Sequence, residues 1–193
     1  VASGAPLHDG GRGRGTGTTR IYQYDGTSWI KLGSDIDAEA SQDESGASVS
    51  LSSDGTIVAI TATLNDGSDG LNSVYSGHTR IYQYDGTSWV QLGSDIDGEA
   101  KFDYSGESVS LSSDGTIVAI GAPYNNNDNG INSGHTRIYQ YDGTSWTQLG
   151  SDIDGENEGD KSGTSVSLSS DGTIVAIGAP YNNNDNGINS GHT

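Results

Sequence analysis

Alternating apolar and polar residues recur along the chain in short runs that predict β-strands. In the clearest copy, residues 164–169 alternate Val and Leu with Ser, and residues 173–177 form a β-branched run. The Ser-Asp-Gly sequence at 170–172 lies between the two runs and predicts a tight hairpin turn. No segment has the period of an amphipathic helix, so we expect almost no helix.

A second predicted hairpin carries most of the aromatic residues. Residues 136–146 read Thr-Arg-Ile-Tyr-Gln-Tyr-Asp-Gly-Thr-Ser-Trp, and nearly the same stretch ends at Trp29 and at Trp89. The tryptophans Trp29, Trp89 and Trp146 are therefore spaced by 60 and then 57 residues. A fixed period of this length is typical of a repeat architecture rather than of one irregular domain.

Two hairpins per period predict an all-β protein built of β-propeller blades, each with four antiparallel strands in about 57–60 residues. A two-sheet sandwich is the alternative, but a sandwich has no reason to repeat its own sequence. We expect the ring to be open or partial, because propellers close with about four to eight blades. Val1 also indicates a mature or truncated product. The expected segments are a partial blade with strands 2–4 at 1–45, full repeats at 46–105 and 106–162, and a partial blade with strands 1 and 2 at 163–193.

The stretch 162–181 resembles the FG-GAP repeat, the blade unit of integrin α-subunit propellers and of many secreted microbial proteins. Gly-Ala-Pro recurs at 121–123, 178–180 and 4–6, whereas 61–63 has lost it, and Ser-Gly stands where the family has Phe-Gly. The resemblance covers the whole chain and implies a propeller. Members of the family often carry a calcium loop in the hairpin before the Gly-Ala-Pro strand. This chain has one Asp there, too few oxygen ligands for calcium, so that site is not transferred.

The charge balance narrows the class of partner. The chain has 26 acidic and 8 basic residues, a formal net charge of −18, and no cysteine. Such a field repels nucleic-acid phosphates and anionic lipid surfaces, so we expect neither a nucleic-acid partner nor membrane insertion. The lack of cysteine excludes a thiol nucleophile and a disulfide framework.

The loops between repeats concentrate the acids and are the candidate metal sites. Carboxylates at alternate positions of a flexible turn supply the hard oxygen ligands that calcium prefers, so calcium is the candidate cofactor. The competing interpretation, a solvated acidic loop, is the one that the sequence favours. The candidate ligands are Asp35, Asp37, Glu39, Asp95, Asp97, Glu99, Asp152, Asp154 and Glu156.

Other constellations favour structural interpretations. Neighbouring acids resemble a glycosidase pair, but they recur identically in every copy, whereas an active site breaks symmetry. Tyr22, Tyr24 and Trp29 are expected to pack between blades rather than to stack on a sugar.

These observations predict a non-enzymatic structural or adhesive module, extracellular or at the cell surface. We expect self-association through open strand edges, with head-to-tail assembly into a filament or a larger propeller. The alternative is a propeller that binds an extracellular glycan or protein on a calcium-assisted acidic loop face.

Overall fold

The computed structural model describes residues 1–9, 13–67, 74–183 and 190–192, and within these ranges the protein contains only strands, turns and loops. The prediction of an all-β chain is confirmed. No helix that is long and apolar enough to cross a membrane occurs in the described ranges.

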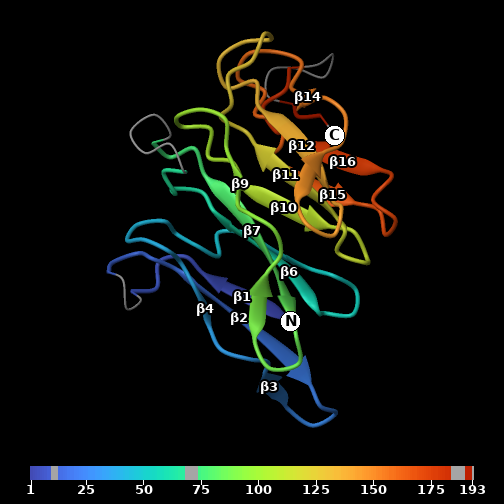
Figure 1. The fold of residues 1–193 in the computed structure, drawn as a ribbon. Helices are drawn as coiled ribbons and strands as arrows, with labels where there is room; N and C mark the ends of the chain where they lie inside the picture. Colours follow the sequence, from blue (N-terminus) through green and yellow to red (C-terminus); the bar gives the residue numbers. More distant parts are fainter. Residues whose placement is uncertain (10–12, 68–73, 184–189, 193) are drawn as a thin grey trace.

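The strands form four antiparallel sheets that follow one another along the chain, with the first sheet and the last at opposite ends of the molecule (Figure 1). The first sheet contains β1 (Ala2–Ala5), β2 (Thr18–Tyr24), β3 (Trp29–Lys31) and β4 (Ile36–Asp37). The second contains β5 (Val49–Leu51), β6 (Ile57–Ala62), β7 (His78–Tyr84), β8 (Trp89–Gln91) and β9 (Ile96–Asp97). The third contains β10 (Ser108–Leu111), β11 (Ile117–Ala122), β12 (His135–Tyr141), β13 (Trp146–Gln148) and β14 (Ile153–Asp154). The fourth contains β15 (Ser165–Leu168) and β16 (Val175–Gly178).

A short fifth strand completes the second and third sheets and was not expected from the sequence. In the second sheet, β7 pairs through Tyr82–Tyr84 with β8 and through His78 and Thr79 with β9. The seven residues of β7 are thus long enough to hold two partners along one edge. This pairing brings the beginning of the acidic loop, at Asp97, directly beside His78.

The hydrophobic core lies between successive sheets, because each sheet is too small to bury its faces alone. One cluster joins Ile81 of β7, which is fully buried, to Val118 and Ile120 of β11. Another joins Ile21 of β2 to Val58 of β6. The repeated apolar positions of the sequence therefore stabilise the junctions between blades.

The first strands of neighbouring sheets lie side by side, and small side chains allow their approach. The hydroxyl Oγ of Ser50 accepts a hydrogen bond from the backbone N–H of Leu111 at 2.9 Å, and Ser110 accepts one from Leu168 at 3.0 Å. A Cβ atom at Gly121 would lie 2.0 Å from the carbonyl oxygen of Gly163. At Gly121 the contact between blades thus leaves no room for a side chain, whereas Thr61 takes the equivalent position in the second sheet.

Candidate functional site

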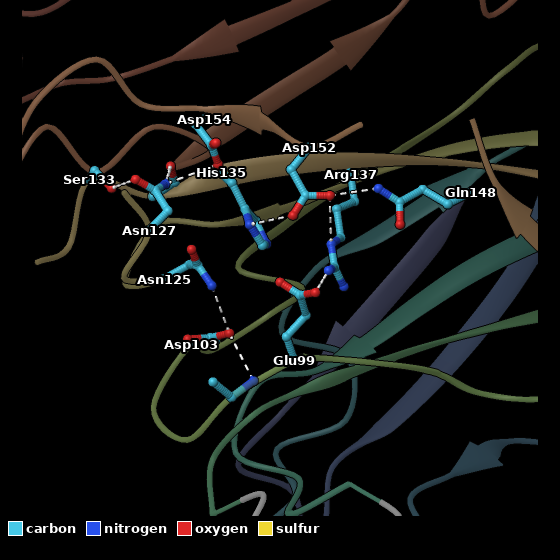
Figure 2. A network of polar contacts seen from close by, with 12 residues as sticks. Glu99, Asp103, Asn125, Asn127, Ser133, His135, Arg137, Gln148, Asp152 and Asp154 are labelled. Carbon is cyan, nitrogen blue, oxygen red and sulfur yellow. Dashed lines mark hydrogen bonds and ion pairs between the residues drawn. The ribbon is translucent and has the colours of Figure 1, made fainter. Parts of the chain in front are cut away.

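An ion-pair cluster connects the second sheet to the third on the loop side of the junction (Figure 2). The guanidinium group of Arg137 in β12 pairs with Glu99 from the preceding acidic loop. Its Nε atom also donates a hydrogen bond to Asp152 Oδ1 at 3.1 Å, and Gln148 Nε2 donates to the same oxygen at 2.6 Å. His135 Nδ1 lies 3.4 Å from Asp152 Oδ2.

The same cluster occurs at the junction of the first and second sheets. Arg80 in β7 pairs with Glu39, and its Nε atom lies 3.2 Å from Asp95 Oδ1. His78 Nδ1 lies 3.5 Å from Asp95 Oδ2. We call the set Glu39, His78, Arg80 and Asp95 the first junction cluster. The set Glu99, His135, Arg137 and Asp152 is the second junction cluster.

The acids that the sequence placed in one loop separate in the structure. Asp95 stays with Arg80 of its own sheet, whereas Glu99, four residues later, pairs with Arg137 of the next sheet. A candidate metal site therefore combines acids of two successive loops rather than three acids of one loop. In each junction cluster, the acid and imidazole ligand atoms lie within 4.8 Å of one another.

The other predicted ligands have separate partners. Asp35 pairs with Arg20 and Lys31 of its own sheet, and Asp37 lies in β4 opposite Thr18. Asp154 accepts a hydrogen bond from Asn127 at 3.0 Å, and Glu156 accepts one from Asn182 at 3.3 Å. Asp97 lies in β9 opposite His78.

A pocket of about 500 Å³ opens beside the first junction cluster. Its wall is formed by Glu39, Asn65, Gly67, His78, Ser94, Asp95 and Asp97. The third sheet has Asn127 at the position of Gly67, and there the amide side chain bonds to Asp154. The missing side chain at Gly67 thus accounts for open space at the first junction.

Three carboxylates and one imidazole line this pocket. Burial lowers the pKa of His78 below its ordinary value, against the opposing effect of Asp95, so the imidazole is neutral at pH 7. The carboxylates of Glu39, Asp95 and Asp97 line the pocket, and the guanidinium group of Arg80 pairs with Glu39 and Asp95.

A buried carboxylate fastens the acidic loops that follow the second and third sheets to the next blade, and sequence reasoning missed it. Asp103 is 2% exposed and accepts hydrogen bonds from Asn125 Nδ2 and from the backbone of Ala100, each at 3.0 Å (Figure 2). Asp160 and Asn182 repeat the contact at 2.7 Å. Desolvation raises the pKa of Asp103. The recurrence of Asp and Asn at a fixed spacing was the available signal.

The arginines were also missed as site residues. Arg80 and Arg137 belong to the repeated Thr-Arg-Ile-Tyr stretch, which the sequence presented as a packing hairpin. An arginine inside a strand that precedes an acidic loop is the feature that could have identified them.

Comparison with known proteins shows the fold and no family. No protein-family model matches the chain, and neither does any curated protein. Among solved structures, the chain is similar to a Bacteroides fragilis protein provisionally described as a 6-phosphogluconolactonase, with a TM-score of 0.52 and 12% identity. The match covers 83% of this chain and 35% of the other, so this chain spans about a third of that protein. Propeller-like blades are thereby supported.

This similarity overturns two expectations. The sequence predicted a non-enzymatic structural or adhesive module, whereas a solved structure with a similar fold is described as an enzyme. The prediction failed because it inferred the absence of a reaction from the identity of the repeats. Repeated strands determine how blades pack, while the loops on the blades determine the chemistry.

Several predictions have no test among these observations. The extracellular location, self-association through strand edges, and the exclusion of nucleic acid and of membrane insertion stay predictions.

Proposed function

We propose that the pocket at the first junction binds a divalent cation, with calcium as the ion. The observation that carries this proposal is the convergence of Glu39, His78 and Asp95, whose ligand atoms lie within 4.8 Å of one another at the pocket wall. Glu39, Asp95 and Asp97 offer carboxylate oxygens, and Asn65 and Ser94 add an amide and a hydroxyl oxygen. Calcium prefers six to eight such hard ligands, with water completing the set.

Arg80 sets the affinity of this site. Its guanidinium group already pairs with Glu39 and Asp95, so a bound cation shares these carboxylates with it. A cation that shares its ligands binds more weakly than one in an all-carboxylate cage, because the two positive charges repel.

Calcium titration of the purified chain, followed by calorimetry and thermal unfolding, tests the proposal. At a concentration 100 times the dissociation constant, calcium is expected to add about 2.7 kcal/mol to the free energy of unfolding. The variant G67N is expected to lose binding, because it introduces the side chain that fills the corresponding space at Asn127. The variant D97N loses one ligand and should bind more weakly.

The matched control is D154N, which changes the equivalent acid in the third sheet and should bind calcium as the unchanged chain does. Equal calcium responses of the unchanged chain and G67N would refute the site. So would an unchanged melting temperature over a wide range of calcium concentration.

A second candidate is hydrolysis of a sugar lactone, favoured by the paired His78 and Asp95 in a chain whose fold occurs in a protein described as a lactonase. A neutral imidazole held by a carboxylate is the arrangement of a general base that activates water. The acidic loops repel a phosphate group, so an unphosphorylated lactone suits this pocket better than 6-phosphogluconolactone.

Measured hydrolysis of both lactones checks this candidate. H78Q is expected to lower the rate at least 100-fold, the usual contribution of a general base. The control D85N alters an exposed turn of the β7–β8 hairpin and should keep the rate. A rate no higher than that in buffer would remove the candidate.

We also propose that the blades are FG-GAP repeats. Support comes from the recurrent Gly-Ala-Pro, whose Gly121 meets Gly163 of the following blade at a distance that admits no Cβ atom. G121A should therefore destabilise the chain through a steric clash. G143A, at a φ of +99° with open space around its Cβ position, measures the cost of backbone strain alone. Equal stability of G121A and the unchanged chain would remove this support.

A further inference from the structure

Three aromatic residues in the loops of the second repeat have no aromatic counterpart in the third. The second repeat has Tyr75, Phe102 and Tyr104 where the third has Asn132, Gly159 and Lys161. The backbone hydrogen bonds at these positions are the same in both repeats. Phe102 and Tyr104 donate N–H bonds to the carbonyls of Val74 and Tyr75 at 2.9 and 3.2 Å, so the two loops lie side by side. The three exchanges therefore fall on one patch.

The aromatic rings of this patch contact one another and extend to the next blade. The Tyr75 ring lies 6.0 Å from Phe102, edge-on, and 6.1 Å from Tyr104, stacked, measured between centroids. Tyr104 in turn meets Tyr124 of the third repeat edge-on at 5.2 Å. We call the four residues Tyr75, Phe102, Tyr104 and Tyr124 the aromatic ladder. Phe102 is 52% and Tyr75 is 38% exposed, so its outer end faces solvent.

The backbone holds these rings in a conformation that bulky residues rarely adopt. Tyr75, Phe102 and Tyr104 have φ angles of +52°, +65° and +50°. A left-handed φ costs free energy for an aromatic residue. The equivalent residues Asn132, Gly159 and Lys161 share this backbone, so it belongs to the repeated loop and presents whichever side chains stand there. Packing of the core does not account for rings that are half in solvent.

The neighbouring junction shows which chemistry these rings accept. The ammonium group of Lys161 lies 4.5 Å from the centroid of the Tyr124 ring and 4.8 Å from that of Tyr181. Tyrosine rings on this face thus already hold an alkylammonium group of the chain itself. The loop that carries Phe102 and Tyr104, residues 93–107, contains five acids (Asp95, Asp97, Glu99, Asp103 and Glu107) and one base, Lys101. The excess of negative charge favours a positively charged ligand over a neutral one.

We propose that the outer end of the aromatic ladder, at Tyr75 and Phe102, binds a small organic cation through an alkylammonium or guanidinium group. The ring faces supply cation–π attraction, and the acidic loop supplies long-range attraction. This site is distinct from the calcium pocket in its residues and in its ligand, and it does not depend on that proposal.

Phe102 is the sole phenylalanine of the chain, so labelling with 4-fluorophenylalanine gives one fluorine resonance at the site. Choline is titrated against its uncharged isostere 3,3-dimethylbutan-1-ol, with a chelator present to exclude metal effects. A saturable shift is expected with choline. The uncharged isostere should bind roughly threefold to thirtyfold more weakly, as the loss of a cation–π contact predicts.

Two variants introduce the residues that the third repeat has at the equivalent positions. The same backbone conformation therefore already accommodates these residues elsewhere in this chain. Y75N introduces the residue found at Asn132, where φ is +53°, and should abolish the choline shift. Y104K introduces a competing ammonium group, as at Lys161, and should weaken binding. Y24L, which removes an exposed ring on a distant hairpin, is the control that should retain it.

No saturable shift, an equal response to both ligands, or choline binding that persists in both Y75N and Y104K would overturn the proposal. A choline response that Y24L removes to the same extent would also overturn it, because non-specific attraction to an acidic protein would then explain the binding.

Discussion

The first and second sheets carry almost the same outer hairpin, yet its residues have different environments. Trp89 packs at a junction and donates its indole N–H to the carbonyl oxygen of Leu32 at 2.9 Å, whereas Trp29 is 55% exposed. The side chain of Arg80 is 8% exposed and pairs with an acid of the preceding loop, while that of Arg20 is 37% exposed and pairs with Asp35 of its own sheet. The same sequence is thus buried or exposed according to whether a preceding blade lies against it.

The largest expected effect comes from the core of a junction. I81A removes a fully buried side chain between the second and third sheets and should lower the free energy of unfolding by about 3–4 kcal/mol, because it leaves a cavity. The equivalent I138A, where the side chain is half-buried, should cost less than half as much. Urea unfolding of both variants measures the difference, and equal losses would contradict the role of the neighbouring blade.

Breaking the first junction cluster should have the next largest effect. R80A leaves Glu39 and Asp95 without their shared cation and is expected to lower the free energy of unfolding by about 2–3 kcal/mol. This loss is at or below the lower end for buried ion pairs, because Glu39 is half exposed. R20A removes a pair that solvent screens and should have the smaller effect. Thermal unfolding at low and high salt distinguishes the two. The loss of stability caused by R20A should shrink at high salt more than the loss caused by R80A, because salt already screens the exposed pair in the unchanged chain.

Loss of one indole hydrogen bond should have a modest effect. W146F keeps an aromatic ring but removes the N–H that Trp146 donates to Leu92 at 2.8 Å, for an expected loss of about 1 kcal/mol. W29F should be nearly neutral, because Trp29 is largely exposed. If the two substitutions proved equally costly, the indole contact would not be what holds neighbouring blades together.

The smallest expected effect concerns turns that every copy shares. Hydrogen bonds from Ser169 Oγ and the Thr173 N–H lower the pKa of Asp171 from its ordinary 3.8 to about 2. The unfolded carboxylate binds protons more readily than the native one, so this stabilisation is present above pH 3.8 and is lost as pH falls toward 2. D171N should flatten acid unfolding between pH 4 and 2. D54N should behave in the same way, because the turn contacts do not depend on a neighbouring blade.

Much of the fold could be predicted from the sequence, because strand patterns and Asp-Gly turns are local. The hairpin of β15 and β16 follows from alternation alone. Packing between blades was predicted for Tyr24 and Trp29, which are instead exposed, whereas the equivalent Trp89 and Trp146 contact the preceding sheet. The fifth strand was missed because Ile96 and Asp97 are too short a run to recognise. The junction clusters were missed because they join residues about 40 positions apart, such as Glu39 and Arg80, whose proximity depends on how two sheets pack.

The repeat, the strands and the concentration of acids in the loops follow from residues that are close along the chain. The packing of the sheets sets which acid faces which arginine, where a pocket opens beside Gly67, and which aromatic rings meet at Tyr75. The physical reason is that burial, ion pairing and ring contact depend on the blade that lies alongside. Identical segments therefore acquire different chemistry at Trp29 and at Trp89.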